Sequence, residues 1–155
     1  MREISTLAGV DAALVNRYFG SKEGLFAEVI GGAFHVEEHL PASLDTVGEF
    51  LVGEIMREDE DDAAGFNPLR LLLLAASSPD TAAMASERFH AEFVQPLARK
   101  LGGRDADLRA TLIGSYVLGL ATMRHLLRAP ALSPASRRKV TALTGQAIQA
   151  CATPG

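Results

Sequence analysis

The chain has 155 residues, of which 48% are hydrophobic and 22% are charged, and its formal net charge is −4 at pH 7. This composition allows a substantial core and excludes general disorder, while one cysteine excludes an internal disulfide and a zinc cage built from cysteines. No signal-peptide pattern opens the sequence, and the uncharged, mostly apolar stretch of residues 110–123 is shorter than the ~20 residues of a membrane span. We therefore expect a cytoplasmic protein without a membrane segment.

The negative charge argues weakly against binding to nucleic acid, because such proteins usually carry a basic face. The acidic residues gather in the run Glu58–Asp62, however, whereas residues 1–24 hold three basic and three acidic side chains. We interpret the acidic run as a solvated loop rather than a metal site. The overall charge is therefore compatible with DNA binding by the first residues.

Helix signals dominate the first third of the chain, where the alternation typical of strands is almost absent. Residues 2–8 are expected to form a short helix that ends at Gly9, since glycine tolerates the positive φ found after helices. Asp11 is placed to cap a second helix at residues 12–19. After Gly20, Ser21 is expected to cap a longer helix that runs to about residue 39.

Five further helices are predicted, at residues 44–57, 66–76, 79–101, 105–128 and from 133 onward. Pro96 lies inside the third of these and should kink or divide it. The run Leu71–Ala76 is apolar on every side, which predicts full burial. The sequence therefore predicts an all-α fold of about eight helices, which begins with a helix-turn-helix and continues as a helical core.

The first two helices and the turn at Gly9 have the arrangement of a helix-turn-helix. Its core is predicted to consist of Ile4, Leu7, Ala8, Val10, Val15 and Phe19. The positions of the second helix that would face a DNA groove are Ala12, Ala13, Asn16, Arg17 and Tyr18. Asparagine can pair with adenine and arginine with guanine, each contributing ~1–3 kcal/mol of discrimination. Ser21, Lys22 and the amides that follow them would hold a phosphate.

Two stretches of this segment, Ala8-Gly9-Val10 and Tyr18-Phe19-Gly20-Ser21-Lys22-Glu23-Gly24-Leu25-Phe26, resemble the DNA-binding signature of the tetracycline-repressor (TetR) family. The resemblance implies that residues 1–20 match the family's helix-turn-helix and that Lys22 matches its phosphate-contacting lysine. Asn16 stands where the family usually has tyrosine, and Leu14 where threonine or serine is common, so base preference does not carry over. The family's first helix and basic arm are expected to be absent, which predicts that Ile4 and Leu7 lack cover.

The resemblance also implies two domains, a DNA-binding segment with a connecting helix at residues 1–39 and a ligand-binding and dimerisation domain at residues 40–155. It implies a homodimer on a four-helix bundle, a palindromic double-stranded operator, a small effector and no cofactor. The last two helices supply the candidate dimer residues, which are Leu112, Ser115, Gly119, Leu127, Leu143 and Ile148. An apolar or aromatic effector would bind among the helices of residues 21–128. Its candidate contacts are His35, Arg70, His90, Phe93, Tyr116, Met123 and Arg124.

Two other functions stay open beside a repressor that is released by its effector. The first is a dimeric ligand- or partner-sensing module that has lost DNA binding together with the first helix. The second is a zinc-dependent hydrolase, because His35, Glu38 and His39 match the H-x-x-E-H pattern of some zinc peptidases. A third zinc ligand is not identified, and the main interpretation is a regulator that is not an enzyme.

Overall fold

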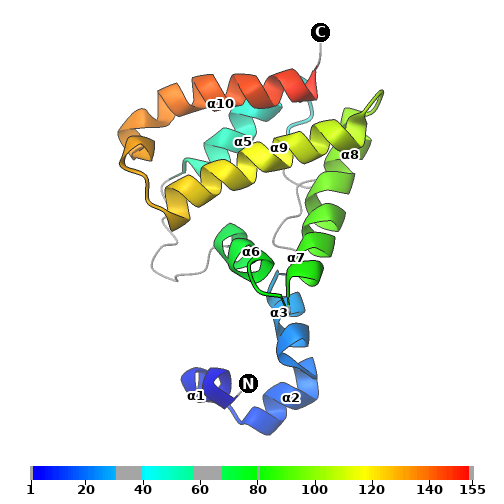
Figure 1. Ribbon diagram of the computed structural model, residues 1–155, viewed down its shortest axis with the longest axis vertical. Coiled ribbons are helices and arrows are strands. Elements are labelled where there is room, and N and C mark those ends of the chain that lie inside the picture. Colours follow the sequence, from blue (N-terminus) through cyan, green and yellow to red (C-terminus); the bar gives the residue numbers. More distant parts are fainter. Residues whose placement is uncertain (1, 31–39, 58–67, 80, 154–155) are drawn as a thin grey trace. The chain divides into compact units, whose positions relative to one another are not determined.

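The computed structural model describes residues 2–30, 40–57, 68–79 and 81–153, and every regular element within these ranges is helical (Figure 1). This confirms the predicted all-α fold. The chain divides into two compact units, residues 1–33 and residues 34–155. Within the described residues, no helix is long and apolar enough to cross a membrane.

The first unit consists of α1 (Arg2–Ala8), α2 (Ala12–Phe19) and α3 (Lys22–Ile30). The Asp11 carboxylate caps α2 by accepting a hydrogen bond of 2.8 Å from the Ala13 amide. Gly9 and Gly20 have φ values of +67° and +70°, which side chains disfavour, and this explains why both turns carry glycine. The predicted starts of the three helices are confirmed, whereas the expected continuation of α3 to residue 39 lies outside the described residues.

The core of the first unit is smaller than the sequence predicted. Val15 is buried and Phe19 is half-buried, as expected, but Ala8 and Val10 are exposed. Leu7 is 85% exposed and Ile4 is also exposed, which agrees with the prediction that these two side chains lack cover. Two short helices that meet at a turn have too little surface to enclose each other's apolar side chains, so assigning all of them to a core was wrong.

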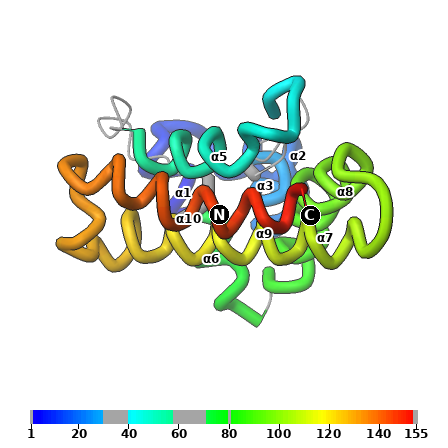
Figure 2. The backbone as a smooth tube through the Cα atoms, turned by 90° about the horizontal axis from the view of Figure 1, so that it is seen from above, coloured from blue at the N-terminus to red at the C-terminus, as the bar shows by residue number. Residues whose placement is uncertain are grey.

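The second unit is built around three long contacts between helices. Its elements are α5 (Val47–Ile55) with a preceding 3-10 turn (Leu44–Thr46), α6 (Pro68–Ala76), α7 (Ala82–Phe89), α8 (Gln95–Leu101), α9 (Ala106–Ala121) and α10 (Arg137–Ala152). Helix α10 packs against both α5 and α9, and α8 packs against α9 (Figures 1 and 2). The largest fully buried side chains are Met56, Leu97, Ile113, Ile148, Val47 and Val52.

Two π-helical turns interrupt the regular helices of this unit. His90–Val94 separates α7 from α8, and the Gln95 amide donates to the His90 carbonyl five residues earlier. Pro96 follows at once, and because it lacks an amide proton, the predicted division of this helix is confirmed. Thr122–Leu126 extends α9 in the same way, so that its helical turns end near the predicted residue 128.

The leucine run in α6 is only partly buried, which corrects the prediction of full burial. Leu72 and Ala75 are buried, but Leu74 is 51% exposed and Ala76 is exposed. Among the described elements of the second unit, helix α6 packs against α7, α9 and the second π-helical turn, and these contacts leave Leu74 exposed. An unbroken apolar run has no periodicity from which the buried side can be identified.

Two arginines fix the ends of the long helices. Arg109 in α9 donates to the Ala152 carbonyl at 3.1 Å, to the Cys151 carbonyl at 3.4 Å and to the Gly102 carbonyl. Arg124 donates to the Arg57 carbonyl at 2.9 Å and to the Leu132 carbonyl at 3.1 Å. Guanidinium groups near the last carbonyls of helices stabilise their ends, so α5, α8 and α10 are tied to α9.

Candidate nucleic-acid interface

Helix α2 has a polar face that is exposed to solvent and an apolar residue that is buried within the first unit. Val15 is 7% exposed, whereas Asn16, Arg17 and Tyr18 are exposed, Tyr18 to 76%. Ala13 is also exposed and Ala12 is half-buried. Among the described residues, no hydrogen bond or ion pair engages the side chains of Asn16 and Arg17. These side chains are therefore available to hydrogen-bond the edges of bases.

The junction between α2 and α3 leaves no room for a side chain at Gly24. A β-carbon on Gly24 would overlap the Phe19 carbonyl oxygen and lie 3.2 Å from its carbon. The Ser21 hydroxyl accepts a hydrogen bond of 2.9 Å from the Gly24 amide, and the Ser21 amide donates to the Phe19 carbonyl at 2.7 Å. The end of α2 and the first turn of α3 are thus fastened to each other.

The start of α3 combines an exposed cation with amides that point out of the helix. Lys22 and Ser21 are exposed, and the first turn of a helix leaves amide donors without intrahelical partners. Hydrogen bonds from its own backbone amide and from the Ser21 hydroxyl, with a smaller contribution from the Lys22 charge, lower the pKa of Glu23. The Glu23 carboxylate therefore uses the amide and hydroxyl donors that a phosphate bound at Ser21 and Lys22 would need.

Comparison with known protein families matches both units. Residues 1–29 match the model of bacterial regulatory proteins of the tetR family, and residues 45–151 match that of tetracyclin repressor-like C-terminal domains. The second match alone covers more than half of the chain. The chain belongs to the TetR family. The resemblance noted in the sequence is thereby confirmed, and the protein is a TetR-family transcriptional regulator, whereas no curated protein matches the sequence.

Membership in the TetR family implies dimerisation, and the second unit has an exposed apolar surface of suitable form. Along α9 and the π-helical turn that follows it, the side chains of Leu108, Leu112, Tyr116 and Met123 are between 42% and 60% exposed. Their spacing of four, four and seven residues places them on one side of the helix. Ser115 and Gly119 lie exposed between them, and Leu143 of α10 is 75% exposed. We call these seven residues the α9–α10 stripe.

The residues predicted for the dimer interface divide into two groups. Leu112, Ser115, Gly119 and Leu143 belong to the α9–α10 stripe, and Leu127 is exposed beyond the second π-helical turn. Ile148 does not share this exposure, because it is fully buried in the core of its own chain. Residues five apart on a helix are about 140° apart around its axis, which separates Ile148 from Leu143.

The described residues among those predicted to contact an effector have different surroundings. Phe93 is buried and stacks on Phe89 at 4.9 Å between ring centroids, Tyr116 and Met123 belong to the α9–α10 stripe, and Arg124 holds the Arg57 carbonyl. His90 is exposed. His35 lies outside the described residues, as does the side chain of Arg70.

Within the described part of the chain, two buried polar atoms have no hydrogen-bond partner, Oε2 of Glu92, which the sequence did not single out, and Nε of Arg124. The other Glu92 oxygen accepts from Arg88 at 3.2 Å. Both residues lie in the π-helical turns, which occur often at functional sites. The sequence carried one signal for the first turn, the proline at position 96.

The zinc-peptidase pattern of His35, Glu38 and His39 lies outside the described residues. Within the described part of the chain, no group of three histidine, cysteine or acidic side chains could hold a metal ion.

Proposed function

We propose that this TetR-family regulator is a repressor, that it binds a palindromic operator as a homodimer, and that a small molecule releases it. The observation that supports the proposal most directly is the exposed face of α2. There, Asn16 and Arg17 engage no other side chain among the described residues, while the buried side chain of Val15 anchors the helix in the first unit. Side chains that read bases must be free in the unbound protein and must stand on a rigid element.

The proposed contacts follow from the chemistry of each side chain. Arg17 and Asn16 read base edges in the major groove, and Tyr18 extends this surface. Ala12 and Ala13 are small, so they permit close approach and can contact thymine methyl groups. Ser21, Lys22 and the first-turn amides of α3 bind phosphates and so position the helix without reading sequence.

The proposed dimer places the α9–α10 stripe of one chain against that of a second copy. The exposed apolar side chains of this stripe support the proposal, because large apolar side chains that gather on a surface mark contact sites between proteins. Serine and glycine in the stripe let two helices approach closely. Two recognition helices about 34–36 Å apart would then reach successive major-groove faces of one operator.

The proposed release requires an effector that binds one arrangement of the dimer more tightly than the other. An apolar or aromatic effector among the helices of the second unit remains our proposal. Helix α3 leads from the DNA-binding residues toward that unit along the chain. Because α2 and α3 are fastened at Gly24, a displacement of α3 would move Asn16 and Arg17 with it.

The proposal is tested by selecting operators for the 155-residue chain from randomised duplexes and measuring binding by fluorescence anisotropy across salt concentrations. We expect a palindrome with half-sites about one helical turn apart and a selected sequence bound at least 10³-fold more tightly than a scrambled one. A reporter placed behind the selected operator should be silenced. Equal affinity for both duplexes would contradict a regulator that reads sequence, and no binding to either would favour the sensing module.

A further inference from the structure

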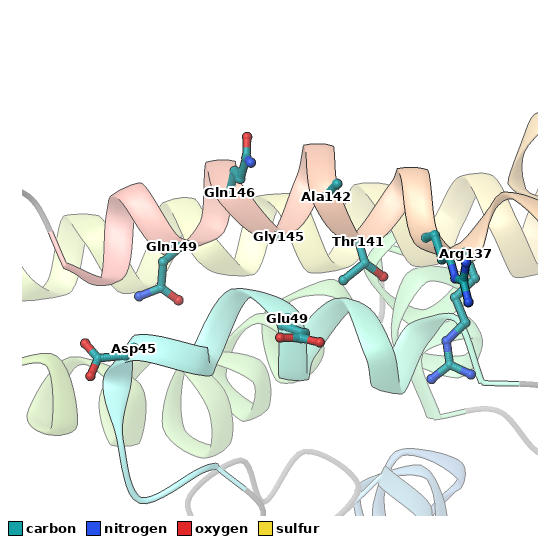
Figure 3. Close-up of a pocket in the computed structure, with 9 residues that line it drawn as sticks. Asp45, Glu49, Arg137, Thr141, Ala142, Gly145, Gln146 and Gln149 are labelled. Carbon is teal, nitrogen blue, oxygen red and sulfur yellow. The ribbon is translucent and has the colours of Figure 1, made fainter.

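A groove of about 600 Å³ runs along the contact between α5 and α10 in the second unit (Figure 3). None of the residues predicted for an effector or for the dimer interface lines it. Its lining is formed by Asp45, Glu49, Arg137, Arg138, Thr141, Ala142, Gly145, Gln146 and Gln149. This volume lies within the range of about 300–1,000 Å³ that small-molecule sites occupy.

The two walls of the groove are held together by one glutamine. Gln149 of α10 accepts a hydrogen bond of 3.1 Å from the Gly48 amide, and its Nε2 donates to the Leu44 carbonyl at 2.8 Å. The start of α5 is thus fixed to the end of α10 by side-chain bonds to its backbone. A ligand would enter a preformed site and would not have to order the walls.

The walls carry opposite charges that do not pair with each other. The acidic residues Asp45 and Glu49 stand on the α5 side, and Figure 3 shows Glu49 between Asp45 and Arg137 along the groove. In the described structure, no ion pair joins these carboxylates to Arg137 or Arg138. Asp45 accepts a hydrogen bond from the Ser43 hydroxyl at 2.9 Å, which leaves Glu49 as the freer carboxylate.

The spacing of Glu49 and Arg138 along the groove, taken between their backbone positions, guides the choice of a ligand that could meet both. A β-carbon on Gly145 would lie 3.6 Å from the Glu49 amide nitrogen, so Glu49 stands opposite Gly145. Arg138 is seven residues before Gly145 on α10, which corresponds to about 10 Å along the helix. An extended dipeptide spans about 7 Å, and charge-assisted hydrogen bonds add about 2.8 Å at each end.

We propose that the α5–α10 groove binds a zwitterionic ligand of dipeptide size, with its ammonium group at Glu49 and its carboxylate at Arg138. Arginine binds carboxylates through a planar pair of donors, and Arg137 supplies a second guanidinium at the same end. Thr141, whose side chain lies on the α5 side of α10 in Figure 3, offers a hydroxyl to the peptide group.

The experiment is calorimetric titration of the whole chain with alanyl-alanine, N-acetyl-alanyl-alanine and alanyl-alanine amide. We expect alanyl-alanine to bind and each blocked form to bind roughly tenfold or more weakly, because each lacks one charged hydrogen bond. Glu49→Gln should weaken the binding of alanyl-alanine but not that of the N-acetyl form. Arg138→Gln should weaken alanyl-alanine but not the amide. These side chains are exposed, so the substitutions leave the core intact.

Two matched variants control for charge on the same helices. Glu54→Gln removes an exposed carboxylate of α5, and Lys139→Gln removes an exposed cation of α10, and neither residue lines the groove. Both should leave the affinity for alanyl-alanine unchanged. The inference is overturned if alanyl-alanine does not bind at millimolar concentration, if the blocked forms bind equally well, or if the control variants weaken binding as much as the groove variants. Operator binding is a separate readout, so failure of the DNA-binding proposal is distinguishable from failure of this one.

Discussion

Gly48 of α5 and Gly145 of α10 lie in direct backbone contact where the two helices cross. A β-carbon on Gly48 would overlap the carbonyl oxygen of Gly145 and lie 2.9 Å from its carbon, so the crossing requires glycine at this position. The contact is asymmetric, because a β-carbon on Gly145 would lie 3.4 Å from the nearest atoms of Gly48, an ordinary van der Waals distance. The close approach brings α5 to the helix that also packs on α9, and so it sets the dimensions of the groove between α5 and α10.

This asymmetry predicts opposite outcomes for two identical substitutions. Gly48→Ala should destabilise the fold by about 1–3 kcal/mol or more, because backbone atoms must move to admit the methyl group. Gly145→Ala should be neutral or stabilise by up to about 1 kcal/mol, since alanine is the better helix former. Urea denaturation of the two variants measures the difference. Equal losses of stability would show that the two helices cross elsewhere.

Local signals in the sequence were sufficient for the helix caps of the first unit and for the division of the helix before Pro96. Asp11, Ser21 and Pro96 act through neighbours within five residues, so their roles as caps and divider could be predicted from spacing alone. The contact between Gly48 and Gly145 could not be predicted, because it joins residues 97 positions apart in the chain. The groove between α5 and α10 depends on that contact, so no candidate residue for it arose from the sequence.

The expectations about burial in α6 and α10 that proved wrong have a common cause, which is that the sequence does not show which side of a helix meets a neighbour. A leucine run such as Leu71–Leu74 indicates that a helix has an apolar surface, but it does not indicate which side of the helix meets a neighbour. For Ile148 and Leu143, helical geometry alone places the side chains on different sides, and only packing decides that the first is core and the second is exposed. The exposure of Asn16, Arg17 and Tyr18 was predictable, because one buried residue of α2, Val15, fixes which side of the helix faces outward.

Gly24→Ala should weaken operator binding while the second unit stays folded. The added methyl group would overlap the Phe19 carbonyl and push α3 away from the end of α2. Specific binding should fall by at least tenfold, because a displacement of about 1 Å in a recognition element is enough to misplace its hydrogen bonds. Anisotropy on the selected operator measures this loss. The exposed substitution Glu28→Ala on the same helix is the control, and equal effects of both would rule out a role for the junction.

Arg17→Ala and Lys22→Ala should lose affinity in different ways. Arg17→Ala is expected to cost ~1–3 kcal/mol on the selected operator and little on random DNA, because a base contact carries the discrimination. Lys22→Ala should weaken both duplexes similarly and reduce the slope of log affinity against log salt by about 1, since one phosphate contact is lost. The salt series distinguishes the two. A parallel loss on both duplexes for Arg17→Ala would contradict its role in reading bases.

Leu143→Glu should dissociate the dimer without unfolding the chain. Leu143 is 75% exposed in a single chain, so the substitution leaves the core untouched. Two-fold symmetry repeats the change, and the loss of two buried leucines amounts to about 3 kcal/mol or more, which is at least about 100-fold in the dimer Kd. Sedimentation velocity measures the shift. Leu74→Glu places the same charge on an exposed leucine of α6, outside the α9–α10 stripe, and should leave the dimer intact.

The carboxylate of Glu23 should make the stability of the first unit depend on pH in acid. Its pKa in the folded chain lies below the ordinary value of 4.5, chiefly because of its own backbone amide and the Ser21 hydroxyl. A group with a lowered folded pKa stabilises the fold above its unfolded pKa, and that contribution is lost as the pH falls through the folded value. Glu23→Gln should therefore lower Tm near neutral pH by an amount that shrinks below pH 4.5. Circular dichroism melts over this range measure the difference, with Glu28→Gln, which lies beyond the first turn of α3, as the control. A Tm difference that stays constant down to low pH would show that the effect of Glu23→Gln does not arise from its charge.

The same variant removes an anion beside Ser21 and Lys22, so at neutral pH it should also tighten binding to random DNA.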